Sequence, residues 1–429
     1  AQIAQLLAQP ATIPQQGERS APPAGGTYRV ELNPQGFPQD NAVLAPSWTS
    51  DLATKPTCQL EASYKISQGF LAQAPRPLWQ LAPLPYKSTA RPEQWLLSHL
   101  QVYVYFQYLV NLEIDRMLAN LERNGLLDNT IVVFTSDHGE LGGAHGGQIE
   151  KWHNAYRETV QVPFVVSSPL INPNEDQMAE LTQITSHIDL VPTLLGLAGY
   201  HKPEQSLLQS LILGHTVYDL PGRDLSPAIT AAAQAGAQAG AQTGAQASAQ
   251  EQEAQGVLFV TQDDITLPTD RNNLPATFVN FLSIVKDAIA QGKQDTREGP
   301  IVQPNHVYAW CESDWKLARY IDGRRSSGTT PENGDPYAED QWELYAVADD
   351  PAEEINLVSW LQGEPVPRPE RIPPGWNLTP EQLETQLNRL RRELAAAMER
   401  VGYGPDGGPA TTATLSPREQ FNRHNFNTP

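Results

Sequence analysis

The chain has 429 residues, a formal net charge of −20 and an isoelectric point near 4.8. Its length allows two or three domains with a sizeable core. The negative charge argues against nucleic acid and anionic membranes as partners, so a pocket for an anionic ester would have to be locally positive. Two cysteines are too few for a disulfide framework, and they leave the redox compartment undetermined.

The N-terminal region carries little structural signal. Residues 1–50 are rich in Gln, Pro and Ala without sustained periodicity, which predicts an extended segment. The sequence shows no signal peptide and no apolar run of transmembrane length, and it does not define a cellular location. Because it begins with Ala1 rather than Met, we expect that the true start, with any targeting signal, could lie upstream.

A long helix is predicted from about residue 92 to residue 124. Pro92 fits its first turn, and Gly125 fits its C-terminal cap. Apolar and aromatic residues recur round most of the helix, so we expect it to be well buried at its centre.

The next segment concentrates chemical groups. Residues 131–134 form a short apolar run rich in β-branched residues, which predicts a strand buried on both faces, and residues 162–166 predict a neighbouring strand. Asp137 and His138 follow the first strand, and a glycine-rich loop then leads to Lys151. In open α/β sheets, ligands bind beyond the carboxyl ends of the strands. Asp and His can hold a divalent cation and a lysine can stabilise an oxyanion, so a metal and an anion could share one pocket.

Simpler structural interpretations of these residues remain open. Asp137 by itself fits a turn or a helix cap, and Lys151 by itself fits a solvated surface charge. His145 fits an ordinary loop histidine, and His153 fits a packed neighbour of Trp152.

Further along, residues 187–199 predict a helix that begins near Ser186 or Asp189 and ends at Gly199. Residues 231–255 repeat Ala-Gly-Ala-Gln with a period of four, which predicts a disordered or loosely helical insertion.

The C-terminal part predicts a small α+β domain over residues 301–403, followed by a tail over 404–429. Strands are expected at 315–321 and 342–347, joined by a hairpin loop, with an earlier strand at 257–260. A helix should begin at Thr379-Pro380 and carry one apolar stripe, made of Leu383, Leu387, Leu390, Leu394 and Met398. Residues 51–300 would form the larger α/β domain.

Several segments together resemble the second half of a sulfatase, in the alkaline-phosphatase superfamily. They are Asn129-Thr-Ile-Val-Val-Phe-Thr-Ser-Asp-His-Gly-Glu, Lys151-Trp-His, Val162-Pro-Phe-Val-Val, Asp189-Leu-Val-Pro-Thr-Leu-Leu-Gly-Leu-Ala-Gly, and Trp342-Glu-Leu-Tyr with Asp349-Asp-Pro-Ala-Glu-Glu-Ile-Asn-Leu357. The resemblance covers roughly residues 50–360 in the family's order, so it is more specific than a lone motif. It implies an alkaline-phosphatase-like sandwich with a mostly parallel central sheet whose N-terminal part is missing.

The resemblance implies roles for five residues. Asp137 and His138 would be metal ligands for a divalent cation, usually Ca²⁺, with Mg²⁺ or Mn²⁺ as alternatives. Lys151 would contact sulfate or phosphate oxygens, and His145 and His153 would line the pocket. The implied substrate is a sulfate ester of a small molecule or a glycan.

One departure from the family pattern is large. The family's nucleophile is a formylglycine made in a C-x-P-x-R motif, and neither Cys58 nor Cys311 lies in such a motif. The early pair of metal-binding aspartates is also absent. We therefore expect a chain that is inactive alone, a weakened metal site, and an exposed apolar edge on the strand at 131–134. An N-terminal sulfatase half on another chain is the implied partner.

Three functions follow as hypotheses. The first is hydrolysis of a sulfuric ester by an arylsulfatase-like enzyme whose nucleophile lies outside this chain. The second keeps the fold but takes a phosphonate monoester or a phosphodiester, which the Asp137-His138 pair permits. The third is a non-catalytic remnant that serves as a structural subunit.

Overall fold

The structure is a computed structural model in which part of the chain can be described. The described residues are 42–50, 55–56, 58–59, 92–151, 153–172, 178–201, 220, 222–238, 256–262, 304–326 and 337–404. Most of the predicted N-terminal segment, most of the Ala-Gly-Gln repeat and nearly all of the tail lie outside these residues. The predicted domain boundaries stay predictions.

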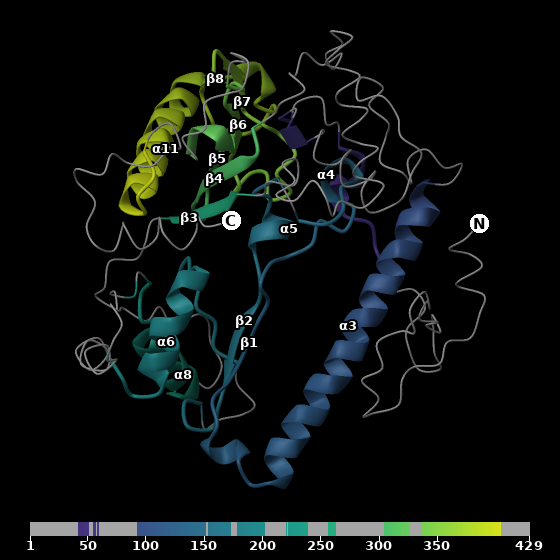
Figure 1. The fold of residues 1–429 in the computed structure, drawn as a ribbon, viewed down its shortest axis with the longest axis vertical. Helices are drawn as coiled ribbons and strands as arrows, with labels where there is room; N and C mark the ends of the chain where they lie inside the picture. The colour runs from purple at the N-terminus through teal and green to yellow at the C-terminus, as the bar shows by residue number, and fades with distance from the viewer. Residues whose placement is uncertain are drawn as a thin grey trace, which may run out of the picture. The chain divides into compact units, whose positions relative to one another are not determined.

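The chain divides into two compact units, one formed by residues 1–45 and 86–127 and the other by residues 46–85 and 128–429. The elements, labelled in Figure 1 where there is room, are η1 (Pro46–Thr49), α3 (Pro92–Arg123), η4 (Leu127–Asn129), β1 (Val132–Thr135), α4 (Ala144–Gly147), α5 (Arg157–Val160), β2 (Phe164–Ser167), η5 (His187–Asp189), α6 (Leu190–Leu197), α8 (Ser226–Gln238), β3 (Val257–Gln262), β4 (His306–Cys311), β5 (Lys316–Ile321), α10 (Gly323–Ser326), β6 (Gln341–Tyr345), β7 (Val358–Leu361), β8 (Glu364–Pro367), η7 (Pro369–Arg371) and α11 (Pro380–Arg400).

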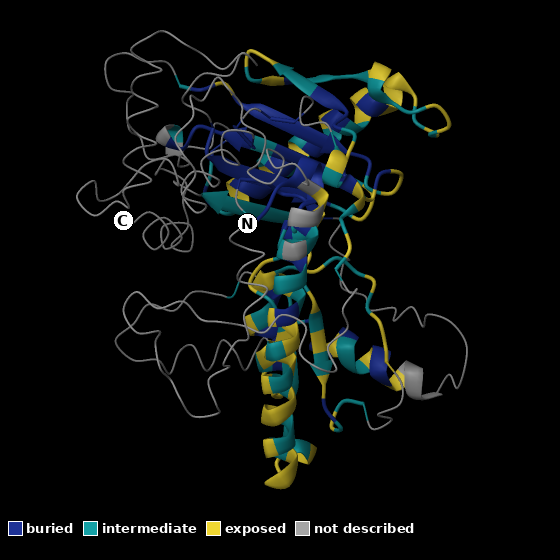
Figure 2. Cartoon of the chain, turned by 90° about the vertical axis from the view of Figure 1, so that its right-hand side faces the viewer, coloured by how far each residue is buried: buried dark blue, intermediate teal, exposed yellow. Residues whose placement is uncertain are grey.

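The long helix α3 is confirmed, and its end is built as expected. Gly125 has a φ of 63°, and its N–H donates to the carbonyl of Glu122 at 2.9 Å, while the next N–H reaches back to Leu121. This is the Schellman arrangement that glycine permits. The expected burial at the helix centre is wrong, because Val110 is 52% exposed and Met117 is 57% exposed. Figure 2 shows exposed and half-buried residues alternating along much of this helix.

The strand at β1 pairs with β2 in an antiparallel ribbon, with Phe134 opposite Val165. All the strand pairs of the described residues are antiparallel. The prediction of a mostly parallel sheet is therefore wrong for these residues. Burial of β1 on both faces is also wrong, since Phe134 is 44% exposed and Val165 is 51% exposed. An apolar β-branched run favours a strand, but the number of neighbouring strands decides how much of it is covered.

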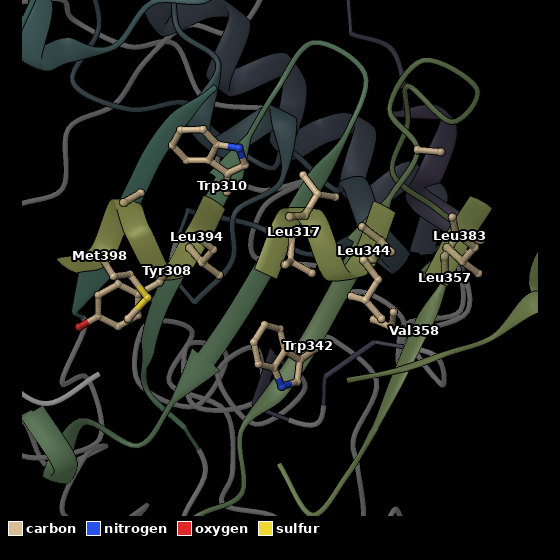
Figure 3. Packing of buried hydrophobic residues seen from close by; sticks show 14 of the residues in the cluster. Tyr308, Trp310, Leu317, Trp342, Leu344, Leu357, Val358, Leu383, Leu394 and Met398 are labelled. Carbon is tan, nitrogen blue, oxygen red and sulfur yellow. The ribbon is translucent and has the colours of Figure 1, made fainter. Parts of the chain in front are cut away.

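The second unit also contains a four-stranded antiparallel sheet in the order β3-β4-β5-β6, followed by the β7-β8 hairpin. The expected strands near 257–260, 315–321 and 342–347 are confirmed, and β4 was missed. Helix α11 covers one face of this sheet, where its apolar stripe packs against Leu317, Trp342 and Leu344. The other face packs against Cys58 and Ala155. Figure 3 shows the first of these packed layers.

Helix α11 begins as its sequence predicts. The hydroxyl of Thr379 accepts the N–H of Gln382, and the Gln382 side chain accepts the N–H of Thr379 in return. This reciprocal capping satisfies two backbone donors at the helix start.

Leu390 is fully buried in this core, so replacing it with alanine should lower the free energy of unfolding by about 3 kcal/mol. The loss combines lost transfer free energy with the cost of the cavity. Urea denaturation followed by tryptophan fluorescence measures it. Asn388 is exposed on the same helix, and Asn388→Ala should change stability by less than about 0.5 kcal/mol. Equal losses in the two variants would contradict this packing.

The helix expected at 187–199 forms as η5 and α6 and ends at Gly199. Its start is anchored by Asp189, whose carboxylate accepts the N–H of Ser186 at 3.1 Å and the N–H of Arg223 at 2.7 Å. The described beginning of the repeat continues α8, so residues 231–238 are helical. Within the described residues, no helix combines the length and the hydropathy needed to span a bilayer.

Candidate functional site

The loop that follows β1, residues 136–159, is closed by backbone hydrogen bonds between its two arms. The N–H of Leu141 donates to the carbonyl of Glu150 at 2.9 Å, and the N–H of Gly139 donates to the carbonyl of Thr159 at 2.9 Å. We call this segment the glycine-rich loop. Lys151 follows Glu150, so it comes one residue after the residue that forms the closing hydrogen bond with Leu141.

Side chains and glycines make this closure possible. Glu140 accepts two N–H groups with one carboxylate oxygen, from Gly142 at 3.1 Å and from Glu150 at 2.7 Å. Gly139 has no room for a side chain, because a Cβ there would lie 1.9 Å from the carbonyl oxygen of Glu158. The glycines therefore allow a close approach of two backbone segments.

The predicted metal ligands Asp137 and His138 lie together at the accessible end of β1, and their side chains are 84% and 41% exposed. One carboxylate oxygen of Asp137 accepts the N–H of His138 at 3.0 Å, and the other lies 3.5 Å from Nε2 of the imidazole. The hydrogen bond from that N–H, followed by the charge of the imidazole, lowers the pKa of Asp137. The carboxylate is thus ionised and available at neutral pH.

These two residues do not complete a metal site. Calcium takes six to eight oxygen ligands, and magnesium takes six in octahedral geometry. Among the residues that the structure describes, no group of three or more His, Cys, Asp or Glu side chains could hold a metal ion. The donor set present here is therefore partial.

Lys151 is half-buried on the same loop. Its ammonium group lies 3.6 Å from the carboxylate of Glu150, and its side chain is 26% exposed. A lysine in this position can contact an anion, although Glu150 offsets part of its charge.

His145 is fully buried and tightly held. Its backbone φ is 49°, in the left-handed region, and its N–H donates to the hydroxyl of Ser47 at 3.1 Å. Its Nε2 lies 2.9 Å from a carboxylate oxygen of Glu158, and its ring stacks on Tyr156 with centroids 3.6 Å apart. Burial alone would raise the pKa of Glu158, but the hydrogen bond and charge of His145 outweigh it and lower that pKa. His153 is also buried, with a φ of 60°.

A buried polar network beside the loop was missed from the sequence. The carboxylate of Glu343 accepts hydroxyl groups from Tyr156 at 2.7 Å, Tyr345 at 2.6 Å and Tyr320 at 2.6 Å, and the amide of Gln59 at 2.8 Å. A charged residue between Trp342 and Leu344 in a buried strand is the one local signal for it, because buried charges need partners. Tyr345 is two residues away in the sequence, but Tyr156 and Gln59 lie far away from Glu343.

Lys55 belongs to the same network. Its ammonium group donates to the hydroxyl of Tyr345 at 2.8 Å and to the carbonyl of Glu353 at 2.7 Å, and it lies 5.0 Å from the ring centroid of Tyr156. Burial lowers the pKa of Lys55, while the nearby charges of Glu343 and Glu353 oppose that shift.

Both cysteines are buried thiols, and neither forms a disulfide. Burial raises the pKa of Cys311 to about 11. A thiol of this kind is a poor nucleophile at neutral pH. The geometry therefore offers no nucleophile at Cys311, in keeping with its sequence context.

Comparison with known proteins shows which family part of this chain resembles. Residues 53–200 match the family model described as sulfatase. The chain is 26% identical over 207 residues to an arylsulfatase of Chlamydomonas reinhardtii, which covers 42% of this chain and 30% of the relative. It is 31% identical over 136 residues to an ulvan-active sulfatase of Formosa agariphila, and this alignment covers 29% of this chain and 26% of the relative. Residues 53–200 of the chain thus resemble the sulfatase family, and these alignments span less than a third of either relative.

Solved structures show a weaker likeness. One, described as being in complex with its substrate D-glucosamine-2-N,6-O-disulfate, has a TM-score of 0.43 and 19% identity, covering 74% of this chain and 43% of the other. The phosphonate monoester hydrolase of Agrobacterium radiobacter has a TM-score of 0.37 and 17% identity, covering 61% and 37%. Values this low carry no argument about substrate or mechanism.

Proposed function

We propose that this chain is part of a hydrolase that cleaves a sulfuric ester. The main support is the family match over residues 53–200, a region that holds Asp137, His138 and Lys151 on one closed loop. Leu141, three residues after His138, donates its N–H to the carbonyl of Glu150, the residue before Lys151. An anion-contacting lysine and the predicted metal ligands thus share a loop.

In this proposal Lys151 contacts the oxygens of the sulfate group and stabilises the negative charge that grows on them during transfer. Asp137 and His138 would contribute two ligands to a divalent cation, which is usually calcium in the family and which would add positive charge to the pocket when bound. The remaining ligands would come from residues outside those described. His145 or His153 would supply the proton that the leaving alcohol needs.

The nucleophile would come from another part of the protein. This sequence contains no C-x-P-x-R segment, and Cys58 and Cys311 are buried. We propose that an N-terminal sulfatase half, upstream or on a separate chain, brings the formylglycine and the missing metal ligands. The exposed apolar side chains of Phe134 and Val165 are consistent with such a partner, because apolar groups of this kind are usually covered in a complete protein.

Two other functions are kept because a specific observation favours each. The histidine at position 138, where many sulfatases have asparagine, fits a phosphonate monoester or phosphodiester hydrolase. The partial donor set among the described residues and the complete burial of His145 fit a non-catalytic structural subunit.

Lys151→Ala should lower kcat/KM for an aryl sulfate by about 100-fold, because the transferred group loses a charged contact. The assay uses the protein together with its upstream segment and compares aryl sulfate with aryl phosphonate. A faster phosphonate reaction would favour the second function. If neither ester is hydrolysed when metal is supplied, the non-catalytic structural subunit is the hypothesis that remains.

A matched control is available in the same loop. Glu150→Gln removes the ion-pair partner of Lys151 but keeps the lysine. Because partly exposed ion pairs contribute little, this variant should change kcat/KM by less than about fivefold. A loss as large as that of Lys151→Ala would show that the loop, rather than the lysine, is sensitive to substitution.

A further inference from the structure

Two features of His145 are unusual for a histidine that only fills space. Its backbone lies in the left-handed region, which costs energy for a residue with a side chain. Its Nδ1 is buried and has no hydrogen-bond partner among the described residues. Strained backbone and unsatisfied buried nitrogen both reduce stability, and such features cluster at functional sites.

The ring of His145 is held in one orientation by its neighbours. Tyr156 stacks on it at a centroid distance of 3.6 Å, with the two ring planes only 12° apart. Glu158 binds its Nε2 at 2.9 Å, so the imidazole can turn neither about its axis nor away from the tyrosine. Glu158 in turn lies against the strand end that carries Asp137 and His138, because its carbonyl leaves no room for a Cβ on Gly139.

Tyr156 is itself anchored from a distant part of the chain. Its hydroxyl lies 2.7 Å from the carboxylate of Glu343 in β6, a residue 187 positions away in the sequence. It also lies 2.7 Å from the side-chain oxygen of Gln59. A hydrogen bond to a buried carboxylate is among the stronger kinds, so the tyrosine ring has little freedom. A continuous set of contacts therefore runs from β6 to the glycine-rich loop.

We propose that Tyr156, anchored by Glu343, is a positioning residue that orients the His145–Glu158 pair against the Asp137-His138 strand end. This inference rests on the proposed function, in which the loop binds the ester and a histidine supplies a proton. Tyr156 touches no substrate in this scheme. It acts through His145, whose imidazole orientation sets where Glu158 and the adjoining loop lie.

Tyr156→Phe is the direct test, since it keeps the stacked ring but loses the hydroxyl anchor. The variant should lower kcat about tenfold and leave KM unchanged, because the His145–Glu158 pair is misplaced while Lys151 keeps its contact with the ester. It should also shift the NMR resonances of the His145 ring protons, which feel the ring current of Tyr156. Selective histidine labelling, with assignment by a His145→Gln variant, reports these resonances.

Tyr320→Phe is the matched control. It removes a hydroxyl from the other oxygen of the same carboxylate, so its effect on stability should be similar, but Tyr320 does not stack on His145. It should leave kcat and the His145 resonances unchanged. If Tyr156→Phe folds poorly, Glu343→Gln takes its place as the test. This variant keeps the shape of the anchor while removing its charge, and it should reproduce the expected Tyr156→Phe effects in weaker form.

Equal losses of kcat in Tyr156→Phe and Tyr320→Phe would overturn the proposal, as would His145 resonances that stay in place in Tyr156→Phe. The resonances can be measured without turnover. If the complete wild-type protein hydrolyses no ester, the proposed function fails, and the resonances still decide whether Tyr156 orients His145.

Discussion

Replacing Glu353 with alanine should lower the free energy of unfolding by about 3–5 kcal/mol. The carboxylate of Glu353 is fully buried, forms an ion pair with Lys316, and accepts the N–H of Arg157 at 2.9 Å. Alanine removes the negative charge and leaves the ammonium group of Lys316, which is only 5% exposed, without its partner in the interior. An uncompensated buried charge is one of the costliest single changes in a protein.

Urea denaturation followed by near-ultraviolet circular dichroism measures this loss. The adjacent Glu354 is exposed, and Glu354→Ala should cost less than about 0.5 kcal/mol. The double variant Lys316→Met/Glu353→Met removes both charges, so it should be more stable than Glu353→Ala. A double variant less stable than the single one would contradict the assignment of the loss to the stranded ammonium group.

Raising the pH above 10 should unfold the second unit steeply. Burial, followed by the charge of Glu343, raises the pKa of Tyr156, Tyr320 and Tyr345 well above the ordinary value of about 10. Below pH 10 the folded and unfolded states both keep these protons, so pH has no effect through them. Above pH 10 the unfolded chain releases protons that the folded chain keeps, so stability falls as pH rises.

Each tyrosine contributes about 1.4 kcal/mol per pH unit, so the three together remove about 4 kcal/mol per unit above pH 10. Lys55 acts in the opposite direction, because its lowered pKa makes stability rise with pH, but this contribution ends near its ordinary value of about 10.5.

Urea denaturation at a series of pH values gives the slope, and tyrosinate absorbance at 295 nm should rise for these residues only as the protein unfolds. Tyr320→Phe should reduce the slope by about 1.4 kcal/mol per pH unit. Ionisation of all tyrosines before any loss of near-ultraviolet circular dichroism would show that these hydroxyls are not buried.

The elements with a local cause could be predicted from the sequence. Thr379-Pro380 and the leucine stripe placed α11 correctly, because capping and helical periodicity depend on residues three or four positions apart. Gly125 ended α3 for a similarly local reason. Burial was predicted less well, as at Val110 and Phe134, because exposure depends on what other segments cover.

The candidate site divides in the same way. Asp137 and His138 are adjacent in the sequence and follow a strand, so their common location could be predicted from the chain itself. The arrangement of Tyr156 with Glu343 could not, since their contact joins segments separated by 187 residues. The stacking of His145 on Tyr156 likewise depends on how the glycine-rich loop closes.

The sequence by itself showed the resemblance of residues 53–200 to the sulfatase family, the grouping of Asp137, His138 and Lys151 in one short segment, and the absence of the C-x-P-x-R motif. These features can be recognised in short runs of residues without knowing which distant residues they contact. Only the tertiary structure decided that β1 pairs antiparallel with β2, that His145 is buried, and that Glu343 anchors the loop. The physical reason is that strand pairing and burial of charge are properties of segments brought together by folding.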